Sequence, residues 1–238
     1  MGGLNVTKIK TNPVTDKLRS GQPAVGSWLS LCSPAAAEAM ARVPWNDTIW
    51  IQRTLDAGAL GLVVPMVNTA QDAASVVGNM RYATKGQRSF GGSRVASYID
   101  GDYRTWTDQN LAVIVMIETI EAVENAEAIM AVDGVVGCFI GPNDLALSMG
   151  LGPSDTGPGT VHEAAIQRVL AACKKTGKAA GKHCFTSAEL NLRIKEGFQF
   201  LALLSDAGFM NMAAKSELGA IDFSGAPGAS KDAKVALY

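Results

Sequence analysis

The fold is decided by residues 112–145, whose sequence is AVIVMIETIEAVENAEAIMAVDGVVGCFIGPNDL. Two apolar, uncharged runs in this stretch, 112–117 and 135–140, predict buried β-strands. The segment between them, 120–131, predicts a helix. A strand, a helix and a second strand in this order are typical of a βαβ unit, in which the two strands are parallel.

The same alternation of strands and helices continues on both sides of this unit. Further strands are expected at 24–29, 60–65, 179–185 and 199–204, and further helices at 34–41, 48–57, 69–82, 161–176, 187–197 and 208–218. Six parallel strands indicate an α/β fold, whereas a closed (β/α)8 barrel needs eight. The shortfall lies between the first two of these helices, where residues 42–47 leave room for at most a stub of strand.

The chain divides into one barrel domain and two flanking segments. We expect residues 1–20 to form a flexible N-terminal arm, 21–222 the barrel domain, and 223–238 a flexible C-terminal tail. Residues 84–109 predict a long loop, and a loop of this length inside a compact domain is either functional or disordered.

Composition excludes several classes of protein. Of the 238 residues, 47% are hydrophobic and 18% charged, which is enough to bury a sizeable core. The net charge of −1 offers no basic surface for nucleic acid or an anionic membrane. The chain has no apolar run near the ~18 residues of a membrane span, and its N-terminus has no apolar core like that of a signal peptide. Its four cysteines form no Cys-x-x-Cys pair, so we expect free thiols and a cytoplasmic location.

Two carboxylates follow neighbouring predicted strands. Glu118 comes directly after 112–117, and Asp144 follows 135–140 at the start of a short helix. Carboxyl ends of parallel strands collect functional residues, and two carboxylates without a nearby thiolate suit Mg²⁺ or Mn²⁺. The alternative is an ordinary loop acid and a helix cap. The amides of Asn143 and Asp144 at the helix start also suit a carboxylate or a phosphate.

One arginine and two histidines complete the candidates. Arg42 could bind a carboxylate or an enolate oxygen, and the alternative is a surface arginine; it is expected to follow a helix. His162 is expected to lie exposed in the first turn of a helix. His183, near the end of a strand, could reach the active-site mouth or could be a packing residue. No nucleotide-binding or serine-hydrolase motif is present in the sequence.

Five short motifs, in order along the chain, resemble one known family. They are RVPWND at 42–47, LDAGA at 55–59, VPMV at 64–67, IET at 117–119 and FIGPNDL at 139–145. They resemble the HpcH/HpaI aldolases, which are metal-dependent (class II) 2-oxo acid aldolases, and the resemblance covers about residues 26–218. It implies a TIM-type (β/α) barrel of the phosphoenolpyruvate/pyruvate type, here short of one to two β-strands.

The resemblance also implies roles for individual residues. Glu118 and Asp144 match the family's ligands for Mg²⁺, Mn²⁺ or Co²⁺, and Arg42 matches the catalytic arginine that holds the substrate's 2-oxo oxygen. The segment Gly141, Pro142, Asn143 and Asp144 matches the cradle for the substrate carboxylate. The implied reaction is cleavage of a 4-hydroxy-2-oxo acid to pyruvate, or a related 2-oxo acid, plus an aldehyde. Oxaloacetate decarboxylation and a homo-oligomeric state are implied as well.

One departure from the family pattern bears on activity. The family carries a further strand before the matching arginine, which ends in an acidic stretch with a catalytic histidine, and no residue here matches that histidine. Three hypotheses follow. The sequence lacks a segment through a gene-model error, or a natural deletion leaves residual metal-dependent activity. The third hypothesis is a catalytically impaired paralogue that binds metal and a 2-oxo acid or serves only in assembly.

Overall fold

The computed structural model describes residues 8–29, 40–91 and 95–221. Its centre is one parallel sheet of seven strands in the order β1-β7-β6-β5-β4-β3-β2. The strands are β1 (Ala24–Trp28), β2 (Ala41–Arg42), β3 (Gly61–Val64), β4 (Ala112–Ile117), β5 (Gly137–Ile140), β6 (Gly181–Cys184) and β7 (Phe200–Ser205). Within the described residues β1 and β2 form the two edges of the sheet, so the barrel is open between them.

The six predicted strands are all present, and a seventh, β2, begins at Ala41, where the sequence predicted the end of a helix, and ends at Arg42, the first residue of the segment with room for at most a stub. This confirms an α/β barrel of the TIM type that, within the described residues, is short of strands. Arg42 corrects one expectation, because it ends β2 and pairs with Val63 of β3 instead of following a helix. The predicted helix at 34–41 lies largely outside the described residues.

Alternate residues along each strand serve two different packing layers. Val113, Val115 and Ile117 of β4 face the helices, in the larger of two apolar clusters. Ile114 and Met116 face the inside of the barrel, where they join Val63, Phe139 and Ala202 in a second cluster. We call this second side the inner face. By the two-residue period of a strand, Glu118 continues the inner face just beyond β4.

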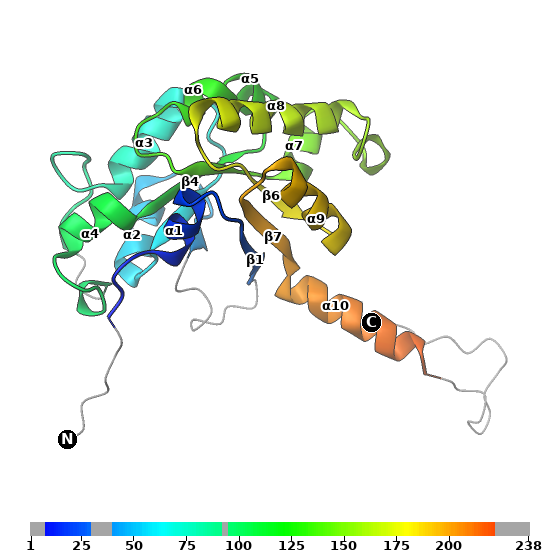
Figure 1. Ribbon diagram of the computed structural model, residues 1–238, viewed down its shortest axis with the longest axis horizontal. Coiled ribbons are helices and arrows are strands. Elements are labelled where there is room, and N and C mark those ends of the chain that lie inside the picture. Colours follow the sequence, from blue (N-terminus) through cyan, green and yellow to red (C-terminus); the bar gives the residue numbers. More distant parts are fainter. Residues whose placement is uncertain (1–7, 30–39, 92–94, 222–238) are drawn as a thin grey trace.

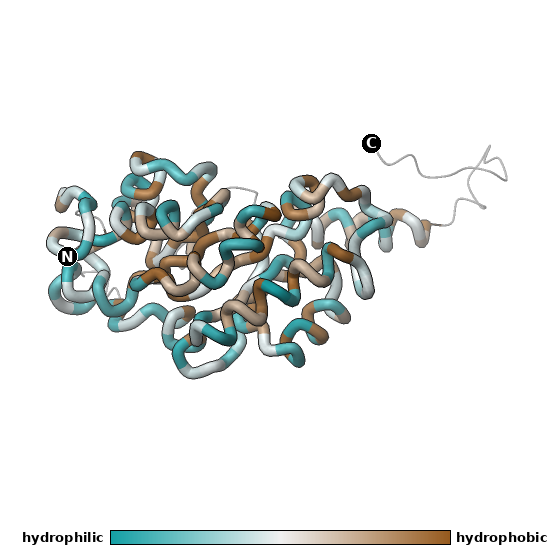
Figure 2. Tube along the Cα trace, turned by 90° about the horizontal axis from the view of Figure 1, so that it is seen from above, coloured by the Kyte–Doolittle hydropathy of each residue, from teal (hydrophilic) through white to brown (hydrophobic). Residues whose placement is uncertain are grey.

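Helices cover the outer face of the sheet. They are α2 (Thr48–Ala57), α3 (Ala70–Met80), α5 (Ile120–Glu124), α6 (Ala126–Met130), α7 (Pro142–Ser148), α8 (Val161–Thr176) and α9 (Ser187–Glu196). The last helix, α10 (Asp206–Gly219), buries none of its residues. Figure 1 shows α3, α5, α6 and α8 on one side of the sheet and α10 projecting from the body. The apolar strands run through the middle of the molecule, with hydrophilic stretches mostly around its rim (Figure 2). The single helix predicted at 120–131 is divided at Asn125, whose side-chain amide donates to the Asn68 carbonyl at 2.9 Å.

Part of the predicted N-terminal arm is ordered structure. Helix α1 (Pro13–Arg19) begins at Asn12, which is buried, caps the helix, and donates from its side chain to the Leu60 carbonyl at 2.9 Å. Leu18 packs on the inner face. Because these anchors are long-range, the polar sequence around them gave no sign of this helix.

The predicted loop at 84–109 also contains structure, namely a 3-10 turn (Val95–Ser97) and helix α4 (Tyr103–Asn110). Arg88 anchors this segment and is 3% exposed. Its guanidinium lies 4.7 Å from the centre of the Tyr82 ring and 2.6 Å from the Asp56 carboxylate. Arg88 is therefore a structural residue of the loop.

Three described cysteines, Cys138, Cys173 and Cys184, are buried free thiols, as predicted. Cys32 lies outside the described residues. In the part of the chain that the structure describes, no helix combines the length and the apolar character needed to cross a bilayer.

A buried ion pair joins α8 to α9. Arg193 contacts both oxygens of Glu163 at 2.6 Å and Glu196 at 2.9 Å. We expect Arg193→Met to lower the free energy of unfolding by about 3–5 kcal/mol, because Glu163 keeps a partly buried charge without its partner. Urea unfolding measures this loss, and adding Glu163→Gln should restore part of it. A single variant as stable as the unmodified protein would contradict the expectation.

Candidate active site

Glu118 lies at the centre of the candidate site, and only one of its two carboxylate oxygens has a hydrogen-bond partner among the described residues. The residue is 2% exposed, and its Oε1 accepts a hydrogen bond from the Met66 amide at 2.8 Å. Its Oε2 is buried and has no hydrogen-bond partner among the described residues. Burial raises the pKa of Glu118, and the charge of Asp144 raises it further, while the Met66 amide and Arg42 act in the opposite direction. A buried, unpaired carboxylate oxygen is costly unless a cation or donor meets it.

The loop that supports Glu118 is strained. Met66 has a φ of 56°, in the left-handed region that costs a non-glycine residue about 1–3 kcal/mol. This conformation accompanies the hydrogen bond from the Met66 amide to Glu118. A second link joins the same two loops, since the Thr119 hydroxyl donates to the Asn68 side-chain oxygen at 2.6 Å. The surrounding structure thus holds Glu118 in one position.

Gly141 leaves room for the second oxygen of Glu118. A Cβ atom on Gly141 would stand 2.6 Å from Glu118 Oε2 and 3.2 Å from the Met116 methyl carbon. We therefore expect Gly141→Ala to displace the carboxylate and lower the metal-dependent cleavage that the family resemblance implies by about 10²-fold, as misplacements near 1 Å do. Gly78→Ala is the matched control, since a Cβ there meets nothing within 4 Å. Equal rates in the two variants would contradict this role for Gly141.

Asp144 and Arg42 approach the same region from two other elements. Asp144 is exposed in the first turn of α7, whose amino end at Gly141 has no side-chain cap among the described residues. Arg42 is exposed at the end of β2. Both residues line one cavity together with Gly141, which lies against Glu118 Oε2. The structure therefore brings together the three charged residues predicted for the site.

A cavity of about 360 Å³ opens at this end of the sheet. It is lined by Trp28, Leu29, Arg42, Met116, Phe139, Gly141, Pro142, Asn143, Asp144 and His183. His183 thus reaches the mouth, one of the two alternatives that the sequence left open. The expectation for His162 was wrong, because this residue is 3% exposed and its Nε2 lies 2.9 Å from the Pro142 carbonyl. The contact partner on α7 is distant in sequence, so helical position alone could not indicate burial.

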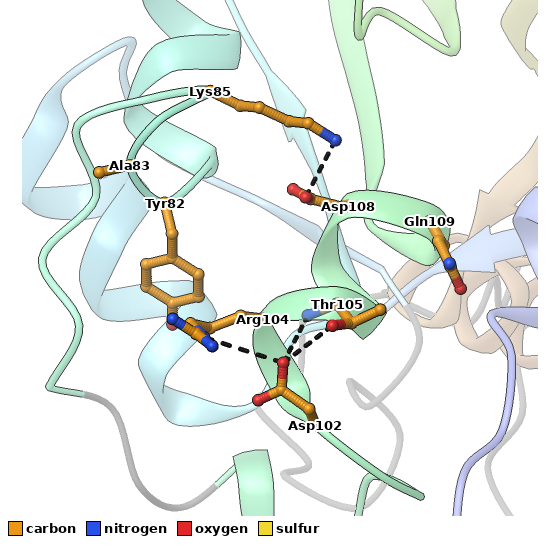
Figure 3. Close-up of a pocket in the computed structure, with 8 residues that line it drawn as sticks. All are labelled: Tyr82, Ala83, Lys85, Asp102, Arg104, Thr105, Asp108 and Gln109. Atoms are coloured by element: carbon orange, nitrogen blue, oxygen red, sulfur yellow. Dashed lines mark hydrogen bonds and ion pairs between the residues drawn. The ribbon is translucent and has the colours of Figure 1, made fainter.

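A second pocket lies at the other end of the sheet. Figure 3 shows it between the segment after α3 and helix α4, lined by Tyr82, Ala83, Lys85, Asp102, Arg104, Thr105, Asp108 and Gln109. These residues precede β4 in the chain, so the pocket is on the amino side of that strand, away from Glu118. Its charges pair with one another, for example Lys85 with Asp108 at 3.0 Å. It offers neither an unpaired carboxylate nor a link to Arg42, and we assign the active site to the first cavity.

Comparison with known proteins agrees with this fold. Residues 23–212 match the HpcH/HpaI aldolase/citrate lyase family, and the chain belongs to that family. It is 31% identical to the hydroxypyruvate/pyruvate aldolase of Rhizorhabdus wittichii, over 86% of this chain and 96% of the relative. It is 33% identical to the 4-hydroxy-2-oxo-heptane-1,7-dioate aldolase of Klebsiella pneumoniae, over 71% of this chain and 78% of the relative.

A solved structure shows the same fold. It is a HpcH/HpaI aldolase/citrate lyase family protein from Burkholderia cenocepacia, 30% identical, with a TM-score of 0.80. The similarity covers 88% of this chain and 98% of that one. The curated relatives are therefore pyruvate-type aldolases, and the solved relative carries the same type of barrel.

Proposed function

We propose that this protein is a metal-dependent carbon–carbon lyase. It cleaves 4-hydroxy-2-oxo acids to pyruvate, or a related 2-oxo acid, and an aldehyde, and it also decarboxylates oxaloacetate. The observation that carries the proposal is the buried, unpartnered Oε2 of Glu118 beside a cavity that Arg42 and Asp144 line. Membership of a family whose curated relatives are pyruvate-type aldolases supports it.

The donor set fits a hard divalent cation. Glu118 supplies a buried oxygen and Asp144 an exposed one, and none of the described residues that line the cavity is a cysteine. We assign Mg²⁺, Mn²⁺ or Co²⁺ to these two carboxylates, since such cations prefer oxygen ligands. The bound cation would supply Lewis-acid stabilisation of the enolate that forms during cleavage.

The other residues of the cavity would hold the substrate. Arg42 presents a fixed guanidinium that donates hydrogen bonds to the 2-oxo oxygen and to the enolate oxygen that develops from it. Gly141, Asn143 and Asp144 offer backbone amides to the substrate carboxylate at the start of α7, and Pro142 fixes the turn there. Pyruvate and related 2-oxo acids have both groups that this arrangement would recognise.

One observation favours a second candidate function. The strands β1 and β2 do not pair, so the described residues include no strand that closes the barrel between them. The alternative is therefore a catalytically impaired paralogue that binds metal and a 2-oxo acid or serves only in assembly. We propose that the protein forms a homo-oligomer, since α10 buries none of its own residues in the single chain. The free thiols support action in the cytoplasm.

The experiment that tests the proposal is an assay of pyruvate release. The purified protein is given 4-hydroxy-2-oxoheptanedioate or oxaloacetate, with Mn²⁺ or with EDTA. We expect release from both substrates with Mn²⁺ and none above background with EDTA. A folded protein that releases no pyruvate from either substrate would contradict the lyase assignment and leave the binding or assembly role.

A further inference from the structure

Cleavage of a 4-hydroxy-2-oxo acid requires a proton acceptor in the cavity. The C4 hydroxyl loses its proton and becomes a carbonyl, while the electron pair of the C3–C4 bond moves into the enolate of pyruvate. Three side chains that line the cavity carry ionisable groups, namely Arg42, Asp144 and His183. Arginine stays protonated at neutral pH, and Asp144 is assigned to the cation. Among the described residues that line the cavity, His183 is the remaining group that can accept the proton.

The sheet places His183 on the inner face. Its neighbours Lys182 and Cys184 turn outward: Lys182 pairs with Glu189 on α9, and Cys184 joins the outer apolar cluster. His183 is in register with Ala202 of β7, an inner-face residue. On the other side Lys182 pairs with Ile140 of β5, so His183 lies beside Gly141, where the assigned substrate cradle begins.

The surroundings fix the imidazole and leave it a free nitrogen. Lys182 Nζ donates to the His183 carbonyl at 2.8 Å and lies 2.5 Å from Glu189, whose other oxygen accepts from the Phe185 amide at 3.0 Å. The Phe185 ring packs edge-on against the imidazole, with ring centres 4.8 Å apart. His183 Nδ1 is buried and has no hydrogen-bond partner within the described residues.

The charge state of His183 suits a base. Burial lowers the pKa of His183, the positive charge of Lys182 lowers it further, and Glu189 opposes both effects. A histidine with a lowered pKa is neutral at physiological pH and has a lone pair available.

We propose that His183 is the general base of this site, taking the proton from the C4 hydroxyl as the C3–C4 bond breaks. This assignment rests on the proposed lyase function. It gives the chain a proton acceptor on β6, in a cavity where the described residues offer no second uncharged titratable group.

Comparing two reactions at one site tests the base. Decarboxylation of oxaloacetate forms the same enolate by loss of CO₂, with no hydroxyl proton to remove. We expect His183→Asn to lower kcat for aldol cleavage by about 10²–10⁴-fold, as loss of a general base does, and to keep decarboxylation within about tenfold. Glu118→Gln is the matched control and should lose both reactions. Thermal unfolding verifies that each variant folds, and a rise in Tm with Mn²⁺ verifies that His183→Asn still binds the metal.

Each other outcome overturns the assignment. Unchanged cleavage in His183→Asn, or equal loss of both reactions, would show that His183 is not the base. If the unmodified protein decarboxylates oxaloacetate but does not cleave the 4-hydroxy-2-oxo acid, His183 is not a general base. The metal site is still supported in that case. An unmodified protein with neither activity would refute the lyase function itself. If His183→Asn does not fold, His183→Phe, which suits the aromatic inner face, takes its place in the same comparison.

Discussion

Replacing Glu118 with glutamine is expected to lower metal-dependent pyruvate release by about 10³-fold or more. Lewis-acid stabilisation by a bound cation contributes several kcal/mol, and each 1.36 kcal/mol corresponds to about tenfold in rate. The amide keeps the shape of the side chain but loses the charge of the buried ligand. Glu121→Gln, an exposed acid one turn further along in α5, is the matched control and should keep full activity.

Glu118→Gln is also expected to change the stability of the protein and its response to Mn²⁺. Because the pKa of Glu118 is raised in the folded protein, the metal-free fold binds more protons than the unfolded chain above the ordinary pKa of glutamate. The contribution of Glu118 to the free energy of unfolding is therefore lost as the pH rises from the ordinary pKa of glutamate through the raised pKa of the folded protein. The amide does not titrate, so metal-free Glu118→Gln should be at least as stable as the unmodified protein at neutral pH. It should also show no rise in Tm with Mn²⁺, and a retained rise would contradict the assignment of Glu118 as a ligand.

Replacing Arg42 with methionine is expected to lower kcat for pyruvate release by about 10²–10³-fold, the usual cost of removing one donor to a developing oxyanion. Arg42→Lys should recover only part of this loss, because an ammonium lacks the planar pair of donors. Mn²⁺ binding should persist in both variants, since Arg42 is not assigned as a ligand. The exposed Arg53 of α2 provides the control, Arg53→Met. Full activity in Arg42→Met would show that Arg42 has no role in catalysis.

Much of the fold could be predicted because the strands of the sheet are recognisable as short apolar runs in the sequence. Uncharged runs such as 112–117 are buried on both faces, as expected for strands covered by helices and by the inner cluster. Glu118 could be predicted as a site residue because it breaks such a run at its carboxyl end. The stub β2 and helix α1 depend on pairing with Val63 and on anchors at Leu60, so only the folded chain reveals them.

The chemistry of the site could not be predicted from the sequence and follows only from the structure. The sequence places a carboxylate at 118, but its unpartnered oxygen depends on the Met66 amide and on the space left by Gly141. The two histidines show the same limit. His162 is buried by a carbonyl on α7, whereas His183 faces the cavity because its neighbours Lys182 and Cys184 turn toward the helices.

A titration of the protein with Mn²⁺, followed by electron paramagnetic resonance of the free ion, tests the metal site directly. We expect one Mn²⁺ site per chain in the unmodified protein. Even residues that only support a metal ligand affect affinity by about 10–100-fold, so loss of a ligand in Glu118→Gln should weaken binding by at least about 100-fold. Equal Mn²⁺ affinity in the two proteins, or no binding by either, would contradict the site built on Glu118 and Asp144.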